Sequence, residues 1–326
     1  HLPQKAALRR AIERYPEKIW LHWVHSGPSQ APPDVCYPST LRYSAASHSV
    51  YCFLNETQRH DCALMLGATH DQIAVVYNSR DVRDLYSFCP ETNALIDAFD
   101  LTNHEIMQVY PFSSARWQAK GVHRLCGLFG AWKDMGIKVK LVLVNAHANN
   151  PVDDQYVAAI EKAAQACGLD VDKDVIITSR FASAARDGAK KAGDTAAAKE
   201  WAEWTHCVPH RVVRELNMLA NVFVFPSESE CCSLIQAEAA ASGKFMILNS
   251  AFPAMQEFAT EGTLSFDLTN NDPETNWEFY ECAAREAWSK LQTETAVLNM
   301  TRARFSIDTE SLRTYGPRSL GRPSNC

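Results

Sequence analysis

Residues 221 to 250, NVFVFPSESECCSLIQAEAAASGKFMILNS, constrain the fold more than any other part of the chain. They read as a buried apolar strand, a Pro-Ser loop, a helix that carries glutamates and a second buried apolar strand. A strand, a connecting helix and a further strand form one unit of a parallel α/β sheet, and ligands bind such sheets where strands end and helices begin. The stretch therefore predicts the fold class and the edge of the sheet that holds a site.

Glu230 and Glu238 are the acids of this stretch, and they lie a little more than two helical turns apart. We place Glu230 in the loop or the first turn, beside backbone N–H groups that suit a phosphate. Surface helices often carry acids at this spacing, so the spacing alone does not indicate a binding site. One carboxylate for a sugar and one for a ribose is what a nucleotide-sugar site needs.

The stretch resembles the signature of retaining glycosyltransferases with the GT-B fold, the glycogen-synthase-like group. Their signature is Pro-Ser-x-x-Glu-x-Phe-Gly-Leu followed by a helix with Glu-Ala. Two positions depart from it, because Cys232 replaces the aromatic residue and Ser233 replaces the glycine that approaches the phosphate. The Cβ of Ser233 narrows that approach. The matching residues are Pro226, Ser227, Glu230, Leu234, Glu238, Ala239 and Gly243.

Apolar, β-rich runs alternate with amphipathic helical patterns along the chain, which indicates a doubly wound α/β fold. The predicted strands are 19–25, 49–54, 72–77, 105–110, 139–144, 175–178, 222–225 and 245–248. The resemblance implies two Rossmann-like doubly wound domains that face a cleft, with a short or truncated N-terminal domain. Only 77 residues precede Asn78-Ser79-Arg80-Asp81, which stands where the family has a turn before its interdomain linker. We predict a partial N-terminal domain over 1–98, a nucleotide-sugar-binding domain over 99–300, and a crossover helix with a tail over 301–326.

A second cluster, PFSSARWQAKG at 111–121, directly follows a predicted strand and precedes a predicted helix. Arg116 and Lys120 could neutralise a diphosphate there, or they could be ordinary solvated surface cations. The resemblance implies a Gly-Arg-x-x-x-x-Lys-Gly loop at this place, with both cations on the nucleotide diphosphate. Lys120 and Gly121 match this pattern, and Arg116 is one residue closer to the lysine than usual.

His25 ends an apolar strand and is followed by Ser-Gly-Pro. In the resembling family a histidine near this position contacts the donor sugar, although His22 is an alternative and a structural role is open for both. The resemblance thus implies catalytic roles for Glu230, His25 and Lys120. It implies donor binding by a set of five residues, namely Arg116, Lys120, Ser233, Leu234 and Glu238.

Composition excludes some classes of function. The net charge of −6 and the pI near 6 give no general reason to expect a nucleic acid or an anionic membrane as partner. No apolar run reaches the length of about 20 residues that spans a bilayer. The eleven cysteines are scattered, which favours reduced thiols in the cytoplasm over a secreted disulfide framework. His206 and His210 lack a second ligand cluster, so we predict no metal site.

We therefore predict a glycosyltransferase that moves a sugar from a nucleotide-diphosphate donor with retention of the anomeric configuration, and without a tightly bound cofactor. The acceptor could be a glycan, a lipid-linked group, a protein or a nucleic acid. The alternatives are a non-catalytic nucleotide-sugar-binding module and a related epimerase or phosphorylase. A basic patch of Arg186, Lys190 and Lys191 in the predicted helical insertion at 182–203 keeps a nucleic-acid acceptor open.

Overall fold

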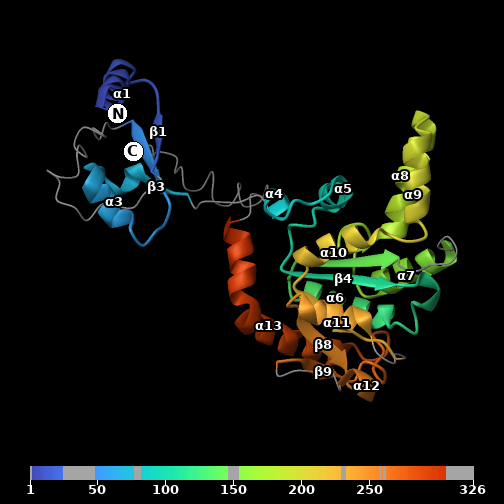
Figure 1. Cartoon of the computed structure of the whole chain (residues 1–326). Coiled ribbons are helices and arrows are strands. Elements are labelled where there is room, and N and C mark those ends of the chain that lie inside the picture. The colour runs from blue at the N-terminus through green and yellow to red at the C-terminus, as the bar shows by residue number, and fades with distance from the viewer. Residues whose placement is uncertain are drawn as a thin grey trace. The chain divides into compact units, whose positions relative to one another are not determined.

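The computed structural model describes residues 2–24, 48–76, 82–145, 154–228, 233–256, 259 and 262–305. Two compact units divide these residues (Figure 1). The larger unit is Tyr86–Met300. The other contains the described residues before Tyr86 together with those from Thr301 onward. The predicted domains, with boundaries at residues 98 and 300, were each assigned a function. The packing of the chain does not test those functions, so this division stays a prediction.

The larger unit contains two parallel three-stranded ladders, in the orders β4-β5-β6 and β7-β8-β9. Strand β4 lies beside β7. The six described strands therefore follow the order 3-2-1-4-5-6 of a dinucleotide-binding fold, with its topological switch point between β4 and β7. Their bounds are Ile106–Phe112 for β4, Val139–Asn145 for β5, Val175–Ile177 for β6, Val222–Phe225 for β7, Phe245–Asn249 for β8 and Leu264–Phe266 for β9.

Two buried amide side chains join β4 to β7. Gln108 donates from Nε2 to the Val224 carbonyl at 2.8 Å, and its Oε1 accepts from the Val224 N–H at 2.9 Å. Asn221 accepts from the Met107 N–H at 2.9 Å and donates to the Glu105 carbonyl at 2.7 Å. Both amides are almost fully buried, and their hydrogen bonds add to one main-chain bond, from the Asn221 N–H to the Met107 carbonyl at 3.0 Å.

Helices lie on both sides of the β4–β5 ladder, with α10 on one side of β4 and α6 on the other in Figure 1. Gly193 (φ +77°) turns α8 into α9, and this helical hairpin projects from the unit, as predicted for the insertion. The helices of this unit are α5 Pro90–Phe99, α6 Val122–Asp134, α7 Asp154–Ala166, α8 Thr178–Ala192, α9 Thr195–Trp204, α10 His210–Leu219, α11 Leu234–Ala241, α12 Pro253–Gln256 and α13 Trp277–Phe305, which continues past Met300.

The core of the larger unit is formed by β4, β5 and β7 with the apolar faces of α6 and α13. Trp132 on α6 donates from its indole to the Ala284 carbonyl on α13 at 3.0 Å. Gly130 on the same helix has no room for a side chain, because a Cβ there would stand 2.2 Å from the Cys167 carbonyl oxygen. The β4–α6 unit is therefore a rigid base for the loop between its strand and its helix.

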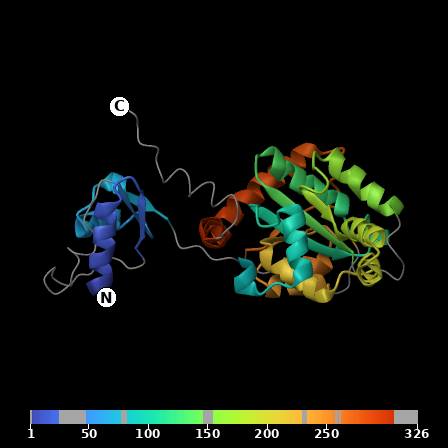
Figure 2. The same cartoon turned by 90° about the horizontal axis from the view of Figure 1, so that it is seen from above.

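The smaller unit has a parallel sheet in the order β1-β2-β3. Its core contains Tyr51, Phe53 and Ile73 from the strands and Cys62 from α3. The described elements are α1 Leu2–Arg14, β1 Trp20–Trp23, β2 Ser49–Phe53, α3 Arg59–Leu66, the 3-10 turn η1 His70–Gln72, β3 Ile73–Val75 and the short helix α4 Val82–Tyr86, which ends in the larger unit. Figure 2 shows this unit from a second direction.

The fold class is α/β with parallel sheets, as the sequence predicted. The eight predicted strands are all present, and β9 is an additional strand that the sequence pattern did not indicate. The expected turn at 78–81 and the part of the expected crossover helix after Phe305 lie outside the described residues.

Candidate functional site

Two loops meet at the switch point, one after β4 and one after β7. The first ends at Gly121, which is the N-cap residue of α6 and has a φ of +67°. Because Gly121 has no side chain, Pro226 can pack directly against it. A Cβ at Gly121 would stand 2.6 Å from the Pro226 carbonyl oxygen. The Glu228 N–H also donates to the Ala119 carbonyl at 3.2 Å. The two sequence clusters predicted to hold the donor are therefore in direct contact at the edge where ligands bind such sheets.

Lys120 is fixed by its backbone within the first of these loops. Its carbonyl accepts from the Tyr110 hydroxyl at 2.9 Å, and its N–H donates to the Arg116 carbonyl at 2.9 Å. Burial lowers the pKa of Lys120, and the nearby Arg116 charge lowers it further. An anion placed between two such cations would raise the pKa of Lys120 again, because opposite charge favours the protonated amine. The structure thus brings Arg116 and Lys120 close enough for their charges to interact.

Ser233 and Leu234 begin the helix after β7. The Ser233 hydroxyl caps α11 by accepting from the Gln236 N–H at 3.4 Å. The Leu234 side chain is exposed and leaves this end of the helix open. N–H groups in the first turn of a helix lack intrahelical acceptors and favour anions. The serine at the family's glycine position is therefore a helix cap here.

Glu238 lies one turn further along α11, and its side chain is 53% exposed. Its carboxylate stands 4.0 Å from Nε2 of His210, the exposed first residue of α10. This places Glu238 beside another helix end and open to a polar ligand. Glu230 and His25 lie outside the described residues, so their predicted roles stay predictions.

Arg124 is a residue of this region that the sequence reading missed. It lies in the first turn of α6 with 8% of its surface exposed, and it forms an ion pair with Glu228. Its Nη2 donates to the Thr269 carbonyl at 3.1 Å. Asn249 then links Thr269 to the β7 loop, because its Nδ2 lies 2.8 Å from the Thr269 hydroxyl and 3.4 Å from the Ser227 carbonyl. Side chains therefore connect the first turn of α6, the loop after β7, the end of β8 and the loop after β9.

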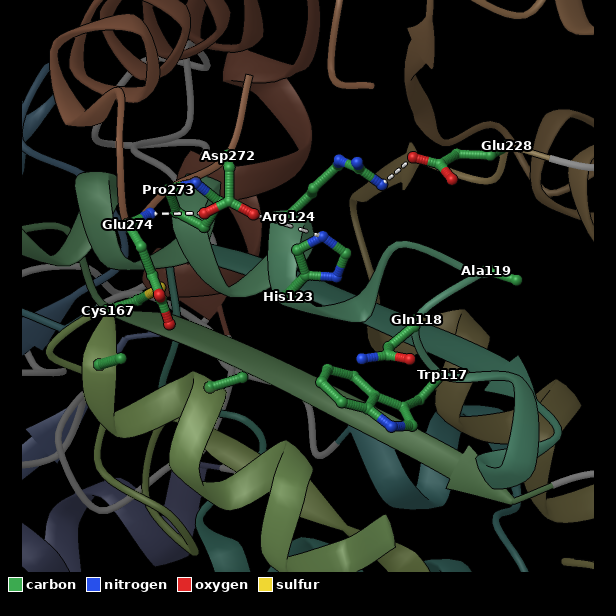
Figure 3. Close-up of a pocket in the computed structure, with 12 residues that line it drawn as sticks. Trp117, Gln118, Ala119, His123, Arg124, Cys167, Glu228, Asp272, Pro273 and Glu274 are labelled. Carbon is green, nitrogen blue, oxygen red and sulfur yellow. Dashed lines mark hydrogen bonds and ion pairs between the residues drawn. The ribbon is translucent and has the colours of Figure 1, made fainter. Parts of the chain in front are cut away.

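A cavity of about 560 Å³ adjoins the outer side of the first loop (Figure 3). Arg124 and Glu228 face each other on one side of it, and His123 faces Asp272 with 3.9 Å between Nε2 and a carboxylate oxygen. Burial lowers the pKa of His123, as does the Arg124 charge, so this histidine is neutral near pH 7. Trp117 packs edge-on against the His123 ring. The cavity is thus a recess with a mixed lining, in which charged side chains stand beside Trp117, Ala119 and Cys167.

Within the described part of the chain, no group of three or more His, Cys, Asp and Glu side chains could hold a metal ion. None of the described helices combines the length and the apolar character that crossing a membrane requires. Seven described cysteines are free thiols, and five of them are buried.

No protein-family model matches the sequence, and no curated protein matches it. Solved structures similar to the chain include HepE of Anabaena in complex with UDP, at 15% identity over 90% of this chain and 70% of that one, with a TM-score of 0.40. A glycosyltransferase from Rickettsia africae is 13% identical over 98% and 81% of the two chains, with a TM-score of 0.41. Sucrose-phosphate synthase of Thermosynechococcus elongatus is 15% identical over 87% and 66%, with a TM-score of 0.37. Likeness at this level leaves function to be argued from the residues themselves.

Proposed function

We propose that the chain is a retaining glycosyltransferase of the GT-B type, which takes a sugar from a nucleotide-diphosphate donor. The observation that carries the proposal is the contact between the Lys120-Gly121 loop and the Pro226–Glu228 segment at the switch point of the sheet. These are the two segments that carry the family resemblance. Their meeting places paired cations and a helix N-terminus at one edge of one sheet, which is what a diphosphate needs.

In this function the main physical demand is stabilisation of negative charge as the diphosphate leaves. Arg116 and Lys120 supply two positive charges, and the first-turn N–H groups of α11 supply a partial one. Glu238, open to solvent, holds the ribose hydroxyls. Glu230 and His25 keep the roles that the resemblance implies, on the donor sugar.

Binding of the donor is tested by thermal shift with UDP, GDP, ADP and their common sugar conjugates. A ligand that binds only the folded state raises the melting temperature, and the stabilisation grows with the logarithm of the ligand concentration relative to its dissociation constant. We expect at least one nucleotide to stabilise the protein and Lys120→Ala to abolish that shift. Lys190→Ala, on the exposed α8 surface of the same unit, is the matched control and retains the shift.

Transfer is tested with the nucleotide sugar that binds best and a panel of glycan, lipid-linked, peptide and oligonucleotide acceptors. Release of the nucleoside diphosphate with an unchanged anomeric configuration in the product supports the full proposal. Binding without turnover by any acceptor assigns the chain instead to the non-catalytic nucleotide-sugar-binding modules. If no nucleotide binds, both functions are wrong.

A further inference from the structure

Arg124 occupies a position that is unfavourable for a cation. It is the third residue of α6, where the helix dipole presents partial positive charge, and it is more than nine-tenths buried. A buried charge requires partners to offset its lost hydration. Glu228 and the Thr269 carbonyl are those partners, and neither belongs to α6. The arginine therefore connects α6 to loops that are distant in the sequence.

The connection leads to Lys120 through one residue. Arg124 holds the Glu228 side chain, and the Glu228 N–H holds the Ala119 carbonyl at 3.2 Å. Ala119 is the residue immediately before Lys120. Glu228 is thus fixed at both its side chain and its backbone, and its backbone contact lies one peptide from the predicted diphosphate cation. Without Arg124, the Glu228 carboxylate, which is 36% exposed, can turn into solvent.

We propose that Arg124 is a positioning residue, which keeps the Lys120 loop in register with the Pro226–Glu228 segment through its ion pair with Glu228. The positioning is a property of the fold, and its effect on nucleotide affinity rests on the proposed function. Arg124 contacts neither donor nor acceptor in this proposal. Its role is to hold Lys120 at a fixed distance from the start of the loop that leads to α11.

The test uses four variants of the full chain: Arg124→Met, Glu228→Gln, the double variant, and the conservative Arg124→Lys. The double variant leaves no unpaired buried charge, so it folds even if a single variant does not. Arg285→Met removes an exposed ion pair with Glu281 elsewhere in the same unit and serves as the matched control. Hydrogen exchange followed by mass spectrometry reports on residues 113–121 and 226–228, with the first turns of α13 as reference.

We expect exchange in 113–121 and 226–228 to become faster by on the order of tenfold in Arg124→Met and in the double variant, with the α13 reference unchanged. Arg124→Lys keeps the charge and recovers most of the protection. Nucleotide affinity, measured by calorimetry with the diphosphate that binds the wild type best, falls on the order of tenfold in Arg124→Met, since a small misplacement of a binding group is enough. The Arg285→Met control matches the wild type in both measurements.

Wild-type exchange rates in the two loops of the folded double variant would overturn the proposal. Equal acceleration in the loops and in the α13 reference would also overturn it, because that result means general destabilisation. A wild type that binds no nucleoside diphosphate refutes the proposed function instead. In that case the exchange measurements still decide the role of Arg124.

Discussion

Gly121 and Pro226 are in van der Waals contact across the switch point, and a Cβ on Gly121 would overlap the carbonyl oxygen, Cβ and Cγ of Pro226. The contact joins the cation-bearing loop after β4 to the loop after β7. It requires a residue that combines a positive φ with no side chain. The donor site that we propose therefore requires a residue without a side chain at position 121.

Gly121→Ala is expected to separate the two loops. The free energy of unfolding should fall by about 2–4 kcal/mol, from left-handed backbone strain together with steric overlap, and nucleotide binding should be lost. Gly136→Ala is the matched control, since Gly136 has a φ of +81° with open space around it and loses only about 1–2 kcal/mol from strain. Urea unfolding and calorimetry measure both effects. Equal losses in the two variants would show that the contact with Pro226 is unimportant.

The lowered pKa of Lys120 predicts an alkaline loss of nucleotide affinity. Burial and the Arg116 charge favour the neutral amine, so as the pH rises Lys120 loses its charge earlier than an ordinary lysine does. In the wild type we expect affinity for the diphosphate to decline as the pH rises toward the ordinary lysine pKa of 10.5. Lys120→Arg keeps its charge over this range, and its affinity should change less. Parallel pH profiles for the two proteins would contradict a phosphate contact by Lys120.

Gln108→Leu is expected to weaken the centre of the sheet. The substitution leaves both the N–H and the carbonyl of Val224 without the partners that Gln108 supplies. Each unsatisfied buried group costs about 1–3 kcal/mol, so we expect a total loss of about 2–6 kcal/mol in urea unfolding. Gln118→Leu, at an exposed position in the next loop, should be nearly neutral. A loss below about 1 kcal/mol for Gln108→Leu would mean that the side chain is not a structural link.

The contribution of Glu215 to the stability of the larger unit depends on pH. It accepts from the Cys89 N–H at 2.8 Å and from Arg211 Nε at 2.8 Å, and so it holds the start of α5 against α10. Burial alone raises the pKa of Glu215, but hydrogen bonds from Thr92 and Cys89 outweigh it and lower that pKa to about 2. Its contribution is therefore complete above the ordinary glutamate pKa and is lost as the pH falls toward 2.

Glu215→Gln should reduce the free energy of unfolding by a few kcal/mol at pH 7, and the difference from wild type should shrink steadily between pH 4.5 and 2. Urea unfolding at pH 7, 5, 3.5 and 2.5 measures it. The exposed Glu200→Gln on α9 is the control and should differ little from wild type at any of these values. A Glu215→Gln difference that is the same at pH 2.5 as at pH 7 would rule out the carboxylate as the cause.

Local sequence pattern predicted most of the helices and strands, and it predicted the two loops that meet at the switch point. Strand β7, Val222–Phe225, was predicted residue for residue because it is a continuous apolar run between Asn221 and Pro226. Strand β9 was missed because its exposed middle residue, Ser265, interrupts the apolar run, whereas the equally short β6 is apolar throughout. Periodicity gives no signal over so short a length.

Long-range pairs could not be predicted in the same way. The Arg124–Glu228 ion pair joins the first turn of α6 to the loop after β7, which is far away in the sequence, and charged side chains are usually solvated. A signal was present in β4, where Gln108 interrupts an otherwise apolar run. A buried amide in such a strand must find partners outside its own ladder. Only the order of the strands reveals that β7 supplies them.

The amide bridges between β4 and β7 give the proposed ligand a mechanical role. Among the described strands of the larger unit, this junction combines the side-chain hydrogen bonds of Gln108 and Asn221 with a main-chain bond from the Asn221 N–H to the Met107 carbonyl, while the ladders on either side rest on main-chain hydrogen bonds. A diphosphate that contacts the loops after β4 and β7 would bridge this junction at the carboxyl ends of the two strands. A bound diphosphate would then hold the β4-β5-β6 and β7-β8-β9 ladders together, and their relative motion would be smallest while the site is occupied.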